Sequence, residues 1–182
     1  IEDLFLRLKG VDQILMDPRI TTVRLVTNPE KIVIKETQRA FMYFCLYKMH
    51  IDAIVMNRIL PQDLTDAYFI PWLEGQKRRL DEAKDYFNPI PIFSVNQFKG
   101  EIIGYDNLKG LAQNIYGKHN PLKRFYKEEP YELRKENGNY LLKLKLPFIM
   151  KKDVELNKFI DELVVRIGGF KRHILLPRQV AS

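Results

Sequence analysis

The run Ile51–Met56 constrains the fold of this chain more than any other stretch. Its residues are mostly apolar and rich in β-branched side chains, which is typical of a strand buried on both faces of a parallel sheet. Asn57 follows directly, at the end where the strands of open α/β sheets bind ligands. An asparagine amide there can pair with the edge of a purine base. Asn57 can equally end the strand and cap a turn, and its position alone leaves both interpretations open.

Around this run, the sequence predicts alternating helices and strands. Apolar spacing indicates helices over 2–16, 29–49, 68–87 and 106–116, and strands over 22–27, 51–56 and 90–94, with a loop over 95–104. Thr27 and Glu30 have capping-box spacing, so we expect Thr27 to cap the helix that follows it. Three parallel strands with crossover helices do not complete a doubly wound domain. We therefore expect segments upstream of Ile1 to supply the other strands.

Two of these helices have an apolar face that predicts which side chains are buried. In the helix over 29–49 the predicted buried residues are Ile34, Thr37, Phe41, Phe44, Cys45 and Met49. In the helix over 68–87 they are Phe69, Trp72, Leu73, Leu80, Ala83 and Phe87, with a charged face opposite. We expect those charges to form local ion pairs on a solvated face.

Beyond residue 130 the hydrophobic period changes to two. Short strands are predicted over 131–135, 140–146, 154–159, 162–167 and 171–176, with a hairpin signal at Asn137-Gly138. This pattern predicts a small antiparallel β-sandwich, which is too small to be very stable unless it packs on the α/β part. The predicted fold is therefore α/β, with domains over 1–116 and 131–182 and a proline-containing linker over 117–130.

The charge distribution changes at the same boundary. Residues 1–116 carry 15 Lys and Arg against 15 Asp and Glu, whereas residues 117–182 carry 15 against 8, so the net charge of +7 belongs to the C-terminal third. These positive residues alternate with apolar strand residues and match no nucleic-acid-binding signature. We interpret them as a solvated face and expect no nucleic-acid partner. The single Cys45 suits a reducing compartment.

Several motifs, in order, give the chain a family resemblance. They are Thr21–Glu30, Val55–Pro61, Ile90–Phe93 and Glu101–Leu108 in the first part, and Glu162–Gly169 and Ile174–Pro177 near the end. The first set resembles the C-terminal half of an ArsA-type anion-transporting ATPase, the family that also contains the targeting ATPases for tail-anchored proteins. The second set resembles the small-heat-shock-protein-like β-sandwich appended to many bacterial members.

This resemblance implies a partial P-loop-type parallel sheet and a site for ATP. Asn57 and Arg58 would contact the adenine, and Pro91, Phe93 and Ser94 would form the wall of the adenine site. The family's phosphate-binding loop and its Mg²⁺ ligands would lie upstream of this chain. Gly117-Lys118 does not replace that loop, because Ala112 stands where its first glycine is required.

The resemblance also implies partners and a location. The parent protein would be a homodimer, either free in the cytoplasm or peripheral at the inner face of the membrane. It would act on a client protein or a membrane partner. Metalloid-binding cysteine pairs and the Cys-x-x-Cys zinc pair of the targeting branch are absent from the sequence.

Two functional hypotheses follow. In the first, the chain is the base-recognition half of an ATPase whose hydrolysis drives a conformational cycle on a partner. In the second, it is a nucleotide-independent, chaperone-like module that holds an apolar partner on the β-sandwich or on the helix over 68–87. The convergence of the motifs on one ligand edge favours the first.

Overall fold

The computed structural model describes residues 10–137, 139–145, 149–159 and 162–175. The N-terminal part of the predicted helix over 2–16 and the turn residue Gly138 lie outside the described residues. The described part of that helix forms α2 (Val11–Met16), which Asp17 ends.

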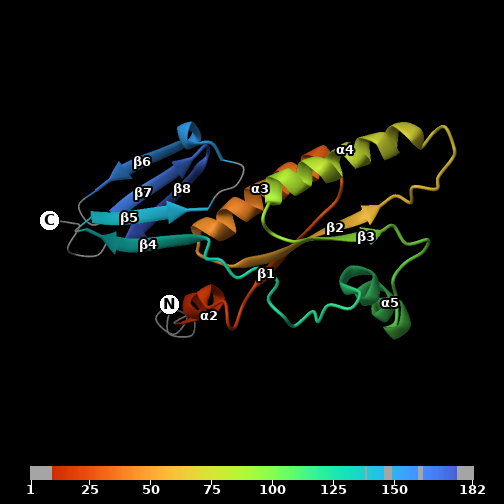
Figure 1. Cartoon of the computed structure of the whole chain (residues 1–182), viewed down its shortest axis with the longest axis horizontal. Coiled ribbons are helices and arrows are strands. Elements are labelled where there is room, and N and C mark those ends of the chain that lie inside the picture. Colours follow the sequence, from red (N-terminus) through yellow and green to blue (C-terminus); the bar gives the residue numbers. More distant parts are fainter. Residues whose placement is uncertain (1–9, 138, 146–148, 160–161, 176–182) are drawn as a thin grey trace, which may run out of the picture.

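The first part of the chain is built on a parallel sheet. Strands β1 (Val23–Thr27), β2 (Ile51–Ile59) and β3 (Ile92–Asn96) lie in the order β1-β2-β3, so β2, the most apolar strand, is central. Helices α3 (Lys31–Leu46) and α4 (Ile70–Phe87) lie on one side of this sheet, and α5 (Tyr105–Tyr116) lies on the other (Figure 1). The predicted α/β class and the crossover helices are confirmed.

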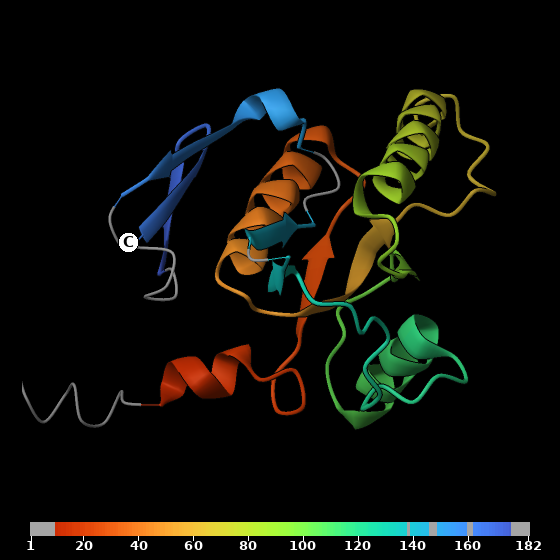
Figure 2. The same cartoon turned by 60° about the vertical axis from the view of Figure 1, so that its left-hand side comes forward.

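The second part of the chain is antiparallel, as predicted. Strands β4 (Tyr131–Glu136) and β5 (Asn139–Leu144) form a hairpin. A short 3-10 turn, η1 (Lys151–Asp153), then leads into a sheet of β6 (Val154–Lys158), β7 (Glu162–Ile167) and β8 (Phe170–Leu175). Both sheets lie next to α3 (Figures 1 and 2).

Helix α3 belongs to two hydrophobic cores. Phe41 and Cys45 pack with Ile54, Met56 and Phe87 above the parallel sheet. Met42 and Leu46, on a neighbouring stripe of the same helix, pack with Val165, Ile167 and Ile174 of the antiparallel part. The apolar spacing of the sequence predicts that Phe41 and Cys45 are buried, but it does not predict burial of Met42 and Leu46. The small β part thus completes its core with two side chains from the α/β part.

The two ends of α3 differ from their predicted positions. Strand β1 continues through Thr27, which pairs with Met56, so Thr27 cannot act as a helix cap. Glu30 is the N-cap instead, without a side-chain hydrogen bond, and the predicted capping box is wrong. The helix ends at Leu46 because Lys48 adopts φ 60° and Met49 N donates to Phe44 O at 2.8 Å, which closes a Schellman-type turn.

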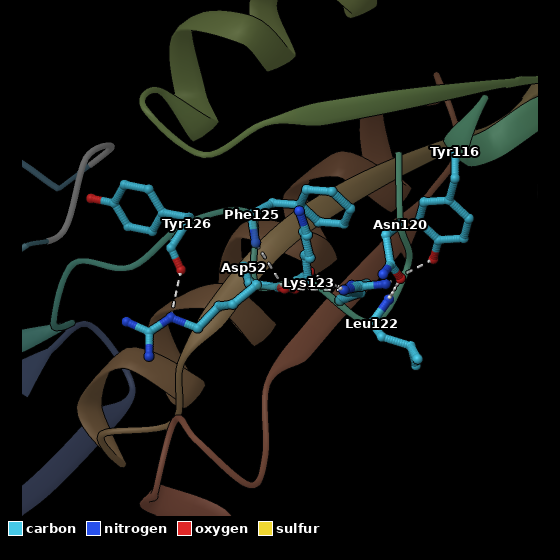
Figure 3. A network of polar contacts seen from close by, with 9 residues as sticks. Asp52, Tyr116, Asn120, Leu122, Lys123, Phe125 and Tyr126 are labelled. Atoms are coloured by element: carbon cyan, nitrogen blue, oxygen red, sulfur yellow. Dashed lines mark hydrogen bonds and ion pairs between the residues drawn. The ribbon is translucent and has the colours of Figure 1, made fainter. Parts of the chain in front are cut away.

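The predicted linker over 117–130 is held against the sheet by an arginine network (Figure 3). Arg24 of β1 donates from Nε and Nη2 to the two carboxylate oxygens of the fully buried Asp52, at 3.0 and 3.2 Å. Its Nη2 also donates to Lys123 O at 3.1 Å, and its guanidinium lies 4.8 Å from the centre of the Phe125 ring. The segment therefore packs on the amino ends of β1 and β2. The domain boundary within it stays a prediction.

A buried histidine lies at the junction of the two parts. His50 is 2% exposed, and its Nε2 lies 3.0 Å from Glu129 Oε2, although its ring nitrogens make no well-aligned hydrogen bond with the described residues. Burial lowers the pKa of His50, an effect that the Glu129 carboxylate opposes and that nearby Arg124 and Lys48 reinforce. The folded chain therefore favours neutral His50.

The shared helix predicts that the two parts unfold together. Leu46→Ala should lower the free energy of unfolding by about 2–5 kcal/mol, because it removes buried methyl groups that the surroundings cannot fully replace. Ile32→Ala on the same helix, at a side chain that is 71% exposed, should change it by less than about 0.5 kcal/mol. Urea denaturation followed by circular dichroism and by the fluorescence of Trp72, the single tryptophan, would test this. A Trp72 transition that Leu46→Ala leaves unmoved would contradict the coupling.

His50 predicts a pH dependence of stability. Because its folded pKa lies below the ordinary value of about 6.5, its contribution is complete above that pH and is lost as the pH falls toward the folded pKa. Urea midpoints between pH 8 and pH 5 should fall more steeply for the unmodified chain than for His50→Gln. His119→Gln, at an exposed histidine, is the matched control and should keep the original slope. Equal slopes for all three would exclude His50 as the cause.

Candidate functional site

A pocket of about 470 Å³ opens at the carboxyl ends of β2 and β3, and we call it the edge pocket. Its lining residues are Asn57, Arg58, Asn96, Gln97, Phe98, Lys99, Gly100, Glu101 and Ile102. This volume lies within the range of small-molecule sites, and the location is where parallel α/β sheets bind ligands.

An irregularity in β2 shapes the edge pocket. Met56 pairs with Ser94 and Ile59 with Asn96, so β2 uses three steps where β3 uses two. The extra residue forms a β-bulge, in which Arg58 adopts φ 55°. This conformation is uncommon for residues other than glycine. The bulge sets Asn57 and Arg58 into the lining of the pocket while β2 continues to Ile59.

The structure changes the interpretation of Asn57. The predicted strand ended at Met56, but β2 extends three residues further, so Asn57 lies inside the strand and does not cap a turn. Its side chain makes no hydrogen bond with any residue that the structure describes, and it is partly exposed in the edge pocket. An amide with both its donor and its acceptor available is suited to pairing with a ligand.

The structure does not bring the three predicted wall residues to the edge pocket. Pro91 precedes β3, and its carbonyl accepts from Ile54 N at 2.9 Å. Phe93 packs instead between α5 and the predicted linker, with its ring centre 5.5 Å from that of Tyr116 and 4.9 Å from that of Phe125. Ser94 is exposed within β3. The reason is register: β3 begins at Ile92 and ends at Asn96, two residues later than predicted, so its carboxyl end comes after these residues.

The segment after β3, which the sequence predicts as a loop over 95–104, lines the edge pocket instead. Gln97 N donates to Ile59 O at 2.7 Å, which holds the start of this segment against the end of β2. Phe98 and the oppositely charged Lys99 and Glu101 belong to the same lining as Arg58. The polar run that begins at Asn96, directly after an apolar strand, is the signal that could have indicated this wall.

A second pocket, of about 350 Å³, adjoins the first, and we call it the aromatic pocket. Its lining residues are Pro29, Glu30, Arg58, Leu60, Tyr68, Phe69, Trp72, Gln76 and Gln97, so Arg58 and Gln97 line both pockets. The buried Gln76 side chain binds both backbone groups of Leu60, accepting from its N–H at 2.7 Å and donating to its carbonyl at 3.1 Å. This clamp fixes the chain as it leaves β2.

The prediction that Trp72 is buried is wrong. Trp72 is 59% exposed and Tyr68 is 70% exposed. The first turn of α4 borders the aromatic pocket at the edge of the sheet, whereas Ala83 and Phe87, further along the helix, are buried as predicted.

The described residues contain neither a metal-binding cluster nor a membrane-spanning helix. Within these ranges, no three histidine, cysteine or acidic side chains gather closely enough to hold a metal ion. None of the helices in the described part of the chain is both long and apolar enough to cross a membrane.

Comparison with known proteins gives two family matches. Residues 1–117 match the model of the family described as anion-transporting ATPase, and residues 137–182 match the model of an HSP20-like domain found in ArsA. The second match begins at the turn between β4 and β5, so the two models cover the parallel sheet and strands β5 to β8 and leave out residues 118–136.

Individual relatives agree with these matches. The chain is 42% identical over its whole length to a putative arsenical pump-driving ATPase of Aquifex aeolicus, of which it covers 47%. It is 34% identical, over 97% of its length, to a protein of the same name from Chlorobaculum tepidum, of which it covers 44%. It is 23% identical, over 67% of its length, to the ATPase GET3 of Candida glabrata. The chain thus spans about half the length of the curated relatives it matches.

Proposed function

Since the chain belongs to the anion-transporting ATPase family, we propose that it supplies the base-recognition half of an ATPase and that the adenine of ATP binds in the edge pocket. The observation that carries this proposal is the amide of Asn57, which pairs with no described residue, in a ligand-sized pocket at the carboxyl edge of a parallel sheet.

The chemistry of the edge pocket fits a purine base. The Asn57 amide offers one donor and one acceptor, which match the N6 and N7 atoms of adenine. The ring of Phe98 offers an apolar surface for stacking. Arg58 and Lys99 supply positive charge to the same lining, where a nucleotide's phosphates need counter-charges. In this proposal Asn57 and Arg58 keep their predicted roles, and the segment after Asn96 replaces Pro91, Phe93 and Ser94 as the wall.

The chain's own residues hold and orient the base. Phosphoryl transfer itself depends on a loop that cradles the phosphates and on Mg²⁺, which neutralises the developing charge. The described acidic residues form no group that suits Mg²⁺. We propose that the part of the parent protein that this chain does not span provides the Mg²⁺ ligands and the phosphate loop.

The partners and the location belong to the same proposal. We propose that the parent works in the cytoplasm as a homodimer and that its cycle acts on a client protein or a membrane partner. The exposed Tyr68 and Trp72 are the observation that favours the alternative, a nucleotide-independent module that holds an apolar partner. Loss of client binding on removal of ATP would support the hypothesis of an ATPase cycle. Client binding that is the same with and without nucleotide would support the alternative.

Base preference tests the edge pocket in the parent protein with its phosphate loop. Guanine-specific P-loop proteins place a carboxylate three residues after the base-reading asparagine, and here that residue is Leu60. ATP should therefore bind at least about 10-fold more tightly than GTP, because unpaired guanine donors cost about 1–3 kcal/mol. Asn57→Ala should weaken ATP binding and narrow the gap. Competition of ATP and GTP against a fluorescent adenine nucleotide measures both effects.

Two variants serve as controls for that experiment. Glu101→Gln removes the one carboxylate among the described lining residues of the edge pocket, and it should leave the preference for ATP intact. Asn114→Ala, at an exposed asparagine of α5, should change neither affinity. Equal binding of ATP and GTP, or an Asn57→Ala variant with full affinity, would refute adenine recognition by Asn57.

The 182-residue chain alone should hydrolyse no ATP above background. Its printed sequence contains no glycine-rich loop with the lysine that phosphoryl transfer requires. Phosphate release by the purified chain, compared with Asn57→Ala, is the measurement. Turnover that Asn57→Ala abolishes would show that this half carries catalytic groups of its own.

A further inference from the structure

Gln76 of α4 has a buried polar side chain that lies outside the proposed base site. It is 5% exposed, and it is not among the lining residues of the edge pocket. Its amide holds the chain three residues beyond Asn57, where Oε1 accepts from Leu60 N at 2.7 Å and Nε2 donates to Leu60 O at 3.1 Å. The donor and the acceptor of one side chain thus bind both backbone groups of a residue in another element.

This contact fixes one end of the bulge in β2. At the other end, Met56 pairs with both neighbouring strands of the parallel sheet. Between these two fixed points, Asn57 and Arg58 stand opposite a single residue of β3. A bulge can be removed by a one-residue slip, which turns every later side chain of a strand to the opposite face. The hydrogen bonds between Gln76 and Leu60 oppose that slip, because the slip would carry Leu60 away from its partner on α4.

The conformation of the bulge needs such a restraint. Arg58 has φ 55°, and a residue with a Cβ atom adopts this left-handed region only where its surroundings enforce it. Two contacts hold the chain beyond Arg58. One is the backbone hydrogen bond from Gln97 N to Ile59 O at 2.7 Å, which most side-chain substitutions leave in place. The other is the side chain of Gln76, which a substitution can remove.

We propose that Gln76 is a positioning residue of the base site, and that through Leu60 it keeps the bulge in the conformation that presents the Asn57 amide to the edge pocket. The inference rests on the proposed function and deepens it by naming a residue that determines base affinity without touching the base. A residue that only stabilised the fold would leave the affinity of the folded protein for ATP unchanged. Binding and stability must therefore be measured separately.

Gln76→Met, in the parent protein with its phosphate loop, removes both hydrogen bonds at nearly constant side-chain length. The dissociation constant for ATP should rise at least about 5-fold, because only a fraction of the molecules then holds the bulge in the binding-competent conformation. The constant for GTP, whose base the Asn57 amide does not match, should rise less. Competition against a fluorescent adenine nucleotide measures both constants.

Phe87→Leu is the matched control on the same helix. Phe87 is fully buried at the far end of α4, so its truncation lowers the stability of the fold without touching Leu60. The variant should keep the ATP constant of the unmodified protein at a temperature where urea denaturation shows both to be folded. Equal weakening of ATP binding by Phe87→Leu and Gln76→Met would assign the effect to lost stability and overturn the positioning role.

A double-mutant cycle tests whether Gln76 acts through Asn57. In a protein that already carries Asn57→Ala, the bulge has no amide left to present. Gln76→Met should then weaken ATP binding by less than about 2-fold, because the two substitutions remove the same interaction. Additive effects of the two substitutions would overturn the inference.

The 182-residue chain permits a test without nucleotide. A positive φ brings the amide proton of a residue close to its own α proton, so Arg58 should give a strong nuclear Overhauser effect between them. Gln76→Met should weaken this signal, because the strand can then relax toward the extended conformation, and Phe87→Leu should not. A signal of unchanged strength in Gln76→Met would overturn the restraint of the bulge by Gln76.

The outcomes separate this inference from the proposed function. ATP binding that Asn57→Ala weakens and Gln76→Met leaves unchanged overturns the positioning role alone. Full ATP affinity in Asn57→Ala refutes the base site and, with it, the inference. Weaker ATP binding in both single variants, with no further loss in the double variant, supports both.

Discussion

Helix α3 is the element on which the rest of the structure depends, because its two apolar stripes complete two different cores. One stripe, with Phe41 and Cys45, covers the parallel sheet, and the other, with Met42 and Leu46, enters the antiparallel part. An ordinary surface helix buries one stripe and exposes the remainder. Here the second stripe gives a β part of some 50 residues the apolar contacts that so small a domain lacks by itself.

The two ends of the parallel sheet have different roles. At the amino ends, the bidentate pair of Arg24 and Asp52 is surrounded by Tyr116, Phe125 and the Lys123 carbonyl, so its charges are paired and its hydrogen bonds are used within the fold. Truncating one partner of such a pair leaves the other charge buried and unpaired, which is destabilising. At the carboxyl ends, the side chain of Asn57 remains unpaired among the described residues. The fold thus closes one edge and leaves the other available to a ligand.

The sequence predicted the type and order of the elements because hydrophobic period is a strong signal over many residues. It located their ends less well. Thr27 has the residue type and spacing of a helix cap, but pairing of β1 with Met56 of β2 takes precedence, and no local pattern reveals that partner. The lining of the edge pocket differs from the predicted wall of the adenine site for a related reason. The sequence predicts a strand over 90–94, but β3 covers Ile92–Asn96, so Phe93 lies within the strand while Gln97 and Phe98 follow it into the lining of the edge pocket.

The bulge at Asn57 and Arg58 shows why a functional edge is harder to predict than a core. A strand without the extra residue would keep the strict alternation of faces along β2. The positive φ of Arg58 and the shifted register interrupt that alternation and set consecutive side chains, Asn57 and Arg58, into one pocket lining. Such a conformation costs free energy and persists only where the surroundings enforce it. Here Gln76 binds both backbone groups of Leu60, and Gln97 N binds Ile59 O, so the chain on the far side of the bulge is fixed from two directions. The local pattern of β2 contains neither partner, since both lie in later elements, and the site therefore exists only once α4 and β3 have packed against β2.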